Sequence, residues 1–237
     1  MNKIMLEKVG KGGNIGKGGN IGKGGIRKGE KEWYKLGNPL LHVLHSVHYV
    51  FPHSSYIEDN FLYVNARSIQ NYKEWRQRNK FTLEHLSTLL ENVIGQTLSL
   101  QKLNSTSIGF NINDLYVVDN TYFFIFPSNN LYHINNNNNN NNTITINLPP
   151  EKPFFTCPEL LKVESLPFSP EIEYFYFMIG QLAIYCFFGK NILRANELMS
   201  EEEIETILSP IKNTHYYWCI KQSIIKEGAK RELIFME

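Results

Sequence analysis

The sequence has no long apolar segment. Its most continuous apolar stretch runs from Tyr174 to Gly189 and is interrupted by Gln181, whereas a membrane-spanning helix needs roughly 20 mainly apolar residues. We therefore expect a buried core helix here and no transmembrane segment. The positive residues near the N-terminus are not followed by an apolar run, so we also expect no secretory signal.

Cysteine is scarce, with only Cys157, Cys186 and Cys219 in the chain. Their number is odd and their spacing is not that of a zinc site, which favours reduced thiols over a disulfide framework or a metal centre. We therefore expect a cytoplasmic protein. An apolar fraction of 42%, with 13% aromatic residues, is typical of a globular chain with a core and not of a disordered one.

Net charge is also low, at +1 for the whole chain, but it is unevenly distributed. The first 35 residues contain nine Lys or Arg and three Glu. Within them, GKGGNI begins at Gly10 and again at Gly16, and GKGGI begins at Gly22. Glycine-rich sequence loses much backbone entropy on folding and adds no side chains to a core. We therefore expect residues 1–32 to form a basic, low-complexity head.

Two functions remain open for this head. Gly10 to Gly16 resembles a phosphate-binding Gly-x-Gly-x-x-Gly loop with one residue too many, but a lone match repeated in tandem indicates low complexity. The lysines alternatively favour weak contact with nucleic acid or another anionic surface. Because no aromatic residues are interleaved for stacking, we expect such contact to be unselective.

A second low-complexity segment consists of eight consecutive asparagines at 135–142. The flanking stretches 126–134 and 143–150 are typical of strands or extended chain, so the tract is predicted to be an inserted loop. Asparagine runs of this kind favour a protist or large-DNA-virus origin. In the viral case, the expected location is the host-cell cytoplasm or the virion.

The rest of the chain is predicted to contain strands followed by helices. Residues 42–52 and 60–66 are rich in Val, Tyr and Phe, which favours strands. Residues 68–75 indicate a short helix, and Thr82 is placed to cap a longer one with leucines at helical spacing. Residues 114–126 then predict a β-hairpin around an Asp-Asn turn.

The C-terminal third is predicted to be helical from residue 158. Ser200 and Glu203 have the spacing of a capping box at the start of one helix. Residues 215–226 and 229–236 are expected to form two further helices.

Three motifs in this order resemble a protein kinase from its hinge onward. FLYVNARSIQNYKEW at 61–75 resembles the hinge strand and the helix after it, and CPELL at 157–161 resembles the Ala-Pro-Glu that ends the activation segment. FMIGQLAIYCFFGKN at 177–191 is similar to the central apolar helix. The resemblance covers roughly residues 58–237. It implies an α+β, protein-kinase-like fold with three parts: the head, a reduced β lobe and hinge at 33–66, and a mainly helical C-terminal lobe at 67–237.

The resemblance also implies a structural ion pair. In kinases the glutamate of the Ala-Pro-Glu motif pairs with an arginine near the C-terminus. Here Glu159 and Arg231 are 72 positions apart, about the separation of that pair. The alternative is that Pro158 and Glu159 only begin a helix, because Pro suits the first turn and Glu favours the helix dipole.

The catalytic groups of a kinase are not found at the matching positions. Phosphoryl transfer needs a carboxylate to orient the hydroxyl, an Asn and an Asp to hold magnesium, and a Lys for the phosphates. Aligning SIGFNIND at 107–114 puts Gly109 at the position of the catalytic Asp and Asp114 at that of the metal-binding Asn. Asp114 then either holds a cation or nucleotide-bound metal, or simply begins a strand.

The remaining kinase signatures are also degenerate. Phe126 and Pro127 stand where the second metal-binding Asp belongs, and no lysine lies between Lys35 and Phe61. In the central helix, Phe175 replaces the expected Asp and only Gly180 matches, with Glu173 as a displaced substitute. We therefore expect no cofactor, and ATP with magnesium only if the chain is an atypical active kinase.

The sequence contains two further groups of residues that could form a site. The histidines at 42, 45, 48 and 53 form the densest cluster, but no Glu or Cys completes a zinc set, and on a strand they alternate between faces. Cys157 with His215 is the only cysteine–histidine combination that suits a nucleophile in a loop.

Together these features predict a catalytically inactive kinase-like, or pseudokinase, module that binds or scaffolds a protein partner. The segments 159–168 and 197–210 correspond to surfaces where kinases meet their partners. The alternatives are an atypical Ser/Thr kinase that binds ATP and a nucleic-acid-binding protein that acts through the basic head. The sequence does not identify the partner.

Overall fold

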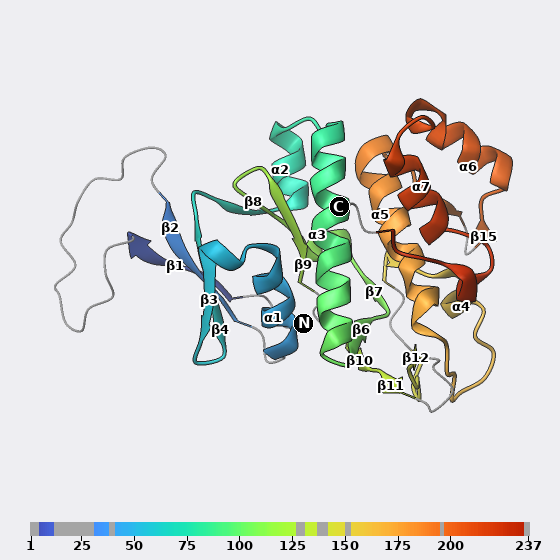
Figure 1. The fold of residues 1–237 in the computed structure, drawn as a ribbon, viewed down its shortest axis with the longest axis horizontal. Coiled ribbons are helices and arrows are strands. Elements are labelled where there is room, and N and C mark those ends of the chain that lie inside the picture. The colour runs from blue at the N-terminus through green and yellow to red at the C-terminus, as the bar shows by residue number, and fades with distance from the viewer. Residues whose placement is uncertain are drawn as a thin grey trace.

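The computed structural model describes residues 5–11, 31–37, 41–126, 131–136, 142–149, 153–194 and 197–234. The fold is mixed α+β (Figure 1). The sequence repeat and the glycine-rich loop that begin at Gly10 lie outside the described residues from position 12 onward, and so do Pro127 and most of the asparagine tract.

One end of the molecule is a four-stranded antiparallel sheet in the order β1-β2-β4-β3 (Figure 1). The strands are β1 (Met5–Lys11), β2 (Glu32–Gly37), β3 (Ser55–Glu58) and β4 (Phe61–Ala66). The strand predicted at 60–66 is confirmed as β4. Within the predicted head at 1–32, β1 pairs with β2, with one irregularity in register between Lys8 and Gly10.

The strand predicted at 42–52 is wrong, because these residues form helix α1 (Leu41–Val50). Val43, Leu44 and Val47 are buried at helical spacing and pack against the sheet. The burial of this face outweighs the preference of Val and Tyr for strands, which is only a weak local tendency.

The middle of the chain forms β5 (Ile69–Asn71), α2 (Tyr72–Arg78) and α3 (Leu83–Lys102). The helix predicted at 68–75 starts later, because residues 69–71 first pair with the hairpin. The helix predicted after Thr82 is confirmed: the Thr82 hydroxyl accepts the backbone N–H of His85 at 3.4 Å. In Figure 1, α3 lies between the sheet with α1 and the later helices.

The hairpin predicted at 114–126 is also confirmed. Strands β8 (Leu115–Val118) and β9 (Tyr122–Ile125) pair antiparallel. Asp119 and Asn120 at the turn both have positive φ, 53° and 60°, which is the conformation of a tight hairpin turn. Short strands surround it: β6 (Ser105–Ser107), β7 (Gly109–Phe110), β10 (Leu131–His133), β11 (Asn135–Asn136), β12 (Asn142–Thr143) and β13 (Phe155–Thr156).

The C-terminal part contains α4 (Pro158–Leu161), α5 (Phe177–Phe188), β14 (Leu193–Arg194), β15 (Glu197–Leu198), α6 (Glu201–Leu208) and α7 (His215–Ser223). The Ser200–Glu203 capping box is confirmed. The helix predicted at 229–236 is wrong for its described residues, 229–234, where a 3₁₀ turn at Gly228–Lys230 is followed by chain without a helix. The side chain of Arg231 bonds back into the fold at this point and fixes the extended course.

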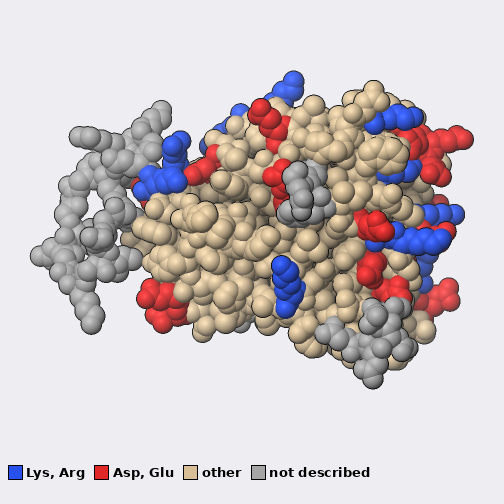
Figure 2. Space-filling model, viewed as in Figure 1, with Lys and Arg blue, Asp and Glu red and all other residues tan. Residues whose placement is uncertain are grey.

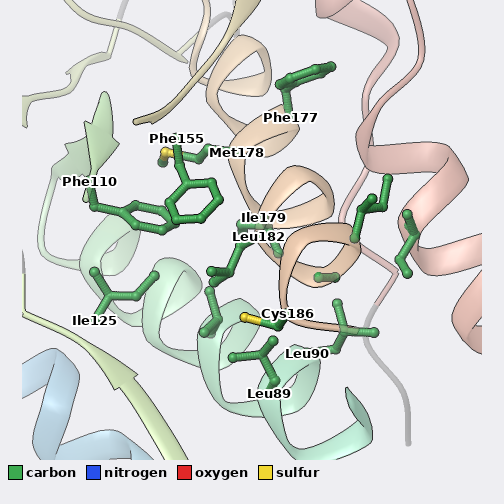
Figure 3. Close-up of a cluster of buried hydrophobic side chains, with 14 of the residues drawn as sticks. Leu89, Leu90, Phe110, Ile125, Phe155, Phe177, Met178, Ile179, Leu182 and Cys186 are labelled. Carbon is green, nitrogen blue, oxygen red and sulfur yellow. The ribbon is translucent and has the colours of Figure 1, made fainter. Parts of the chain in front are cut away.

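Two apolar cores hold these elements together. The larger core lies between α3 and α5, where Leu89 and Leu90 face Leu182 and Cys186 (Figure 3). The smaller core joins the sheet and α1 to the hairpin. Within the described part of the chain, no helix combines the length and apolar character needed to cross a bilayer, and α5 is the buried core helix predicted for 174–189.

Candidate functional site

The Glu159 carboxylate and the Arg231 guanidinium form a two-point ion pair at the base of the helical region. Arg231 Nη2 lies 2.7 Å from Glu159 Oε1, and Nη1 lies 3.1 Å from Oε2. Nη1 also donates to the Tyr174 carbonyl at 2.7 Å, and Nε donates to that of Ile225 at 2.8 Å. Arg231 is only 1% exposed, so the guanidinium ties α4 to the C-terminal segment by bidentate geometry.

The surroundings of the pair leave little free space. The Arg231 guanidinium carbon lies 5.0 Å from the centre of the Phe177 ring. A Cβ added to Gly228 would come within 2.9 Å of Glu159 Oε1 and 2.8 Å of the Tyr174 ring. The pair is therefore held by packing as well as by hydrogen bonds, and it presents no open site for a ligand.

Gly109, at the position aligned with the catalytic Asp, lies in β7 opposite Thr156 of β13. A Cβ at Gly109 would lie 2.2 Å from Pro153 Cγ and 2.8 Å from the Phe155 carbonyl oxygen. Both contacts are closer than atoms can approach without movement of the chain. The position therefore has no room for a carboxylate.

Asp114 is engaged in a local turn. Its Oδ2 accepts the backbone N–H of Asn111 at 2.7 Å, at the start of a 3₁₀ turn. Burial raises the pKa of the Asp114 carboxyl above its usual value, and the Asn111 hydrogen bond opposes this shift in part. These contacts support the reading in which Asp114 precedes strand β8.

Phe126, at the position of the second metal-binding Asp, is buried beside Phe124 in the smaller core. Its backbone N–H donates to the Asp114 carbonyl at 2.8 Å. Among the described residues, no group of three or more His, Cys, Asp or Glu is arranged to hold a metal ion.

The lysine nearest to the expected phosphate-binding strand is Lys35 of β2. Its ammonium lies 3.8 Å above the Phe61 ring, on the face of the sheet opposite to buried Tyr34 and Leu36, which pack with α1. The sequence of α1 contains no acidic residue. On the side of the sheet that faces α1, Lys8 of β1 lies opposite Tyr34 and forms an ion pair with Glu32 of β2. Among the described residues, the Lys–Glu ion pair that positions phosphates in kinases is therefore not formed between Lys35 and α1.

In the segment between β4 and β5, backbone groups of Arg67 and Ser68 form hydrogen bonds with side chains of the protein itself. The Tyr34 hydroxyl donates to the Arg67 carbonyl at 3.3 Å. Asp119 Oδ1 accepts the N–H groups of Arg67 at 2.6 Å and Ser68 at 3.0 Å. Sequence reasoning placed Asp119 in a turn but missed this role, because its partners lie about fifty residues earlier in the chain.

The other candidate residues are separated or buried. His42, His45 and His53 are exposed, while His48 bonds to Ser55 Oγ at 2.6 Å; burial, followed by the nearby His45, lowers the pKa of His48. All three cysteines are buried and free.

Cys157 has no exposed surface, and burial raises its pKa to about 12. A neutral, enclosed thiol is not a nucleophile.

The three residues compared with the kinase central-helix motif, Phe175, Glu173 and Gly180, lie in packed parts of the fold. Phe175 is buried, and Glu173 is half-buried in a 3₁₀ turn, where burial raises its pKa. A Cβ at Gly180 would come within 2.2 Å of Ser223 Oγ. Gly180 is therefore needed for the close approach of α5 and α7.

The predicted partner surface at 197–210 includes α6, which lies beside the start of α7. The Tyr217 hydroxyl donates to both oxygens of Glu205, and Lys221 Nζ lies 2.5 Å from Glu205 Oε1. These hydrogen bonds, from Lys221 first and Tyr217 second, lower the pKa of Glu205. Trp218 of α7 is 57% exposed, and charged side chains gather at this end of the molecule (Figure 2).

The second predicted partner segment, 159–168, begins within α4 and continues past its end. Its residues after Val163 are mostly exposed, including Leu166. Comparison of the sequence with models of known protein families and with curated proteins finds no match to either.

Proposed function

We propose that the chain is a catalytically inactive, protein-kinase-like module that binds a protein partner. The observation that carries the proposal is the buried Glu159–Arg231 pair. It joins the start of α4 to the C-terminal segment across 72 residues, as the resemblance implies for a kinase C-terminal lobe.

The element order supports the same frame. A sheet with one helix, α1, is followed by a connecting segment, a short helix, the long α3, a hairpin and then the C-terminal helices. Small antiparallel strands lie next to the hairpin, and the apolar α5 lies at the centre of the larger core.

Inactivity is supported by what occupies the catalytic positions. Gly109 has no room for a side chain, Phe126 is part of an apolar core, and Lys35 lies on the face of the sheet away from α1. Without these groups, the positions that match the kinase motifs would not balance the charge of a transferring phosphoryl group, and each missing interaction of this class costs several kcal/mol.

The proposed partner surface is the exposed edge formed by α6 and the start of α7. Glu201 and Glu202 are exposed on α6, and Trp218 is exposed on α7. An exposed Trp with neighbouring charges is the kind of residue that anchors protein interfaces, and the fixed Tyr217–Glu205–Lys221 contacts give the surface a defined shape.

Phosphate transfer is the direct test. The purified chain is incubated with labelled ATP, magnesium and a mixture of generic protein substrates, next to an active kinase as a positive control. We expect no transfer to the substrates or to the chain itself. Transfer above background that is lost on substitution of Asp114 would establish the atypical kinase instead.

A further inference from the structure

Four aromatic rings lie on the outward face of the four-stranded sheet. These residues, here called the aromatic face, are Trp33 of β2, Tyr56 of β3, and Phe61 and Tyr63 of β4. Successive residues of a strand point to opposite faces, and Leu62, between two of the rings, is buried in the core with α1. The aromatic face therefore lies on the side of the sheet away from α1.

The rings of the aromatic face pack on one another. The Tyr56 and Tyr63 rings are stacked, with centroids 4.9 Å apart and an interplanar angle of 10°, and the Trp33 ring meets the Tyr56 ring edge-on at 5.1 Å. All four residues are half-buried, and the two cores of described residues, with the side chains packed against them, include none of the four. The rings form a separate apolar patch, and contiguous apolar patches on a surface mark interaction sites.

The charges around the rings are of both signs. On the outward face, Lys35 of β2 lies opposite Glu7 of β1, and Glu58 of β3 lies opposite Phe61. Counted over both faces, the four strands carry three basic residues (Lys8, Lys11 and Lys35) and three acidic residues (Glu7, Glu32 and Glu58). A partner with charge of one sign, such as nucleic acid, therefore meets no matching charge on this sheet.

A second copy of the chain does fit this charge pattern. A two-fold interface joins a surface patch to the same patch on the other copy, so the patch must be complementary to itself. A face with apolar rings and charges of both signs meets this condition. The rings suit it as well, because Tyr and Trp are enriched in interfaces and bring their own polar groups to the rim.

The size of the sheet sets the strength of such a contact. Four strands spaced about 4.8 Å apart, of which β2 and β4 have six residues with a rise of about 3.3 Å each, make a face of roughly 400 Å² in projection. Its accessible area is larger because side chains stand out from the sheet, and each side of a standard interface buries about 800 Å². The face is therefore suited to a weak, concentration-dependent dimer.

We propose that two copies of the chain associate through their aromatic faces about a two-fold axis. The two sheets pack face to face, about 10 Å apart as in a β-sandwich, and α1 of each copy lies on the outer side. The α6–α7 surface proposed above for a protein partner lies at the other end of the molecule and stays accessible (Figure 1).

Sedimentation velocity of the full chain over a range of micromolar concentrations tests the proposal. We expect a monomer–dimer equilibrium in which the sedimentation coefficient rises with concentration to the value of a dimer. We expect no larger species, because a two-fold interface closes once both patches are used.

Substitution of single rings locates the contact. Tyr63→Ala and Trp33→Ala each weaken association by at least about tenfold, because aromatic side chains near the centre of an interface carry much of its binding energy. Tyr63→Phe keeps the ring and most of the affinity. Trp218→Ala removes an exposed ring of α7, outside the sheet, and as the matched control it leaves association unchanged.

Exchange of charges tests the two-fold symmetry. Lys35→Glu gives the outward face three acidic groups, and Glu7→Lys/Glu58→Lys gives it three basic groups, so neither variant associates with itself. An equimolar mixture of the two forms a dimer with one copy of each, which also shows that both are folded. Glu164→Lys/Glu202→Lys makes the same change of charge at exposed positions outside the sheet, and it leaves the dimer intact.

Tryptophan emission gives a readout that needs no substitution in the sheet. In the Trp218→Ala chain, the remaining tryptophans are Trp33 and Trp75, and Trp75 is fully buried. Dilution through the dissociation constant exposes Trp33, so the emission shifts to longer wavelength. Circular dichroism establishes that each variant is folded. Should Tyr63→Ala unfold, the charge exchange and the emission shift still decide the matter.

Four results would overturn the proposal. The first is a chain that remains monomeric at every concentration, whether its Trp33 emission is that of an exposed ring or of one already covered within a single copy. The second is a dimer that the ring substitutions and the charge variants leave unchanged, because a different surface then joins the copies. The third is open-ended assembly beyond the dimer. The fourth is a mixture of the two charge variants that stays monomeric.

Discussion

The side chain of Asp119, in the turn of the β8–β9 hairpin, accepts a hydrogen bond from the backbone of Arg67. Asp119, at the tip of the hairpin, accepts the Arg67 N–H at 2.6 Å, and Tyr34 of the sheet donates to the Arg67 carbonyl at 3.3 Å. Both backbone groups of this residue are thus used within the chain. The contacts fix the segment between β4 and β5 to both the sheet and the β8–β9 hairpin.

The first prediction concerns Asp119. Asp119→Ala removes two hydrogen bonds to a carboxylate and a residue that tolerates positive φ, so we expect the free energy of unfolding to fall by about 2–4 kcal/mol. Asp119→Asn retains an acceptor and the backbone preference and should lose less than half of that. Chemical denaturation measures both, and equal losses would contradict the hydrogen-bonding role.

The second prediction concerns Glu159 and Arg231. Glu159→Gln leaves the buried Arg231 guanidinium without its carboxylate, so it should lower the free energy of unfolding by about 3–5 kcal/mol. Arg231→Met should lower it by a smaller amount, because the Glu159 side chain is 22% exposed and water still reaches its carboxylate. The double variant should lose less free energy of unfolding than the sum of the losses in the two single variants. Glu227 and Lys230 form an exposed ion pair close by, and their removal should cost less than about 1 kcal/mol.

A coupling near zero in this double-mutant cycle would show that Glu159 and Arg231 act independently. That result would remove the observation on which the proposed kinase-like frame depends.

The third prediction concerns Gly109. Gly109→Ala places a methyl group against Pro153 and the Phe155 carbonyl, and we expect a loss of about 1–3 kcal/mol from overpacking. Gly109→Asp should be worse and should not create kinase activity. Gly189→Asn is the control: Gly189 has φ +66° and open space around it, and Asn tolerates this conformation. A melting temperature of Gly109→Asp equal to that of the wild-type chain would contradict the close contacts around Gly109.

The fourth prediction concerns the buried thiols. Burial raises the pKa of Cys157 and Cys186 to about 12, so the folded state keeps both protonated while the unfolded chain ionises them near their ordinary pKa, about 8.5. The unfolded state then binds fewer protons, and the free energy of unfolding falls as pH rises from about 9 to 12.

Ellman's reagent and alkaline denaturation test this prediction. In the native chain, Cys157 and Cys186 should not react rapidly with Ellman's reagent. In denaturant, all three thiols should react. Between pH 8.5 and 10, the free energy of unfolding of Cys157→Ala should fall less with rising pH than that of the parent chain. Rapid modification of Cys157 in the folded protein would contradict its burial.

Local signals made much of the fold predictable. Thr82 and Ser200 define helix starts through caps, and the Asp119-Asn120 pair defines the hairpin, because each of these features depends on neighbours within a few residues. The helical state of 41–50 was missed because Val and Tyr favour strands locally, and only packing of Val43, Leu44 and Val47 on the sheet decides the outcome.

Long-range contacts were less predictable. The Glu159–Arg231 contact was reached only through a resemblance. Buried Gln96, which both donates to and accepts from the backbone of Ile125, and Tyr34, which reaches Arg67, left no signal in the sequence. The sequence did not indicate that Trp33, Tyr56, Phe61 and Tyr63 share one face of the sheet, because they come from three strands and alternation by itself does not say which face is covered.

Thermal unfolding with ATP and magnesium tests the central claim most directly, that a kinase-like frame has lost its nucleotide site. Ligand at about 100 times its dissociation constant stabilises a protein by roughly 2.7 kcal/mol, which gives a clear rise in melting temperature. We predict no change in melting temperature at millimolar ATP with magnesium, beyond that seen with magnesium and an unrelated anion at equal ionic strength. A saturable, magnesium-dependent rise specific to ATP would contradict the account.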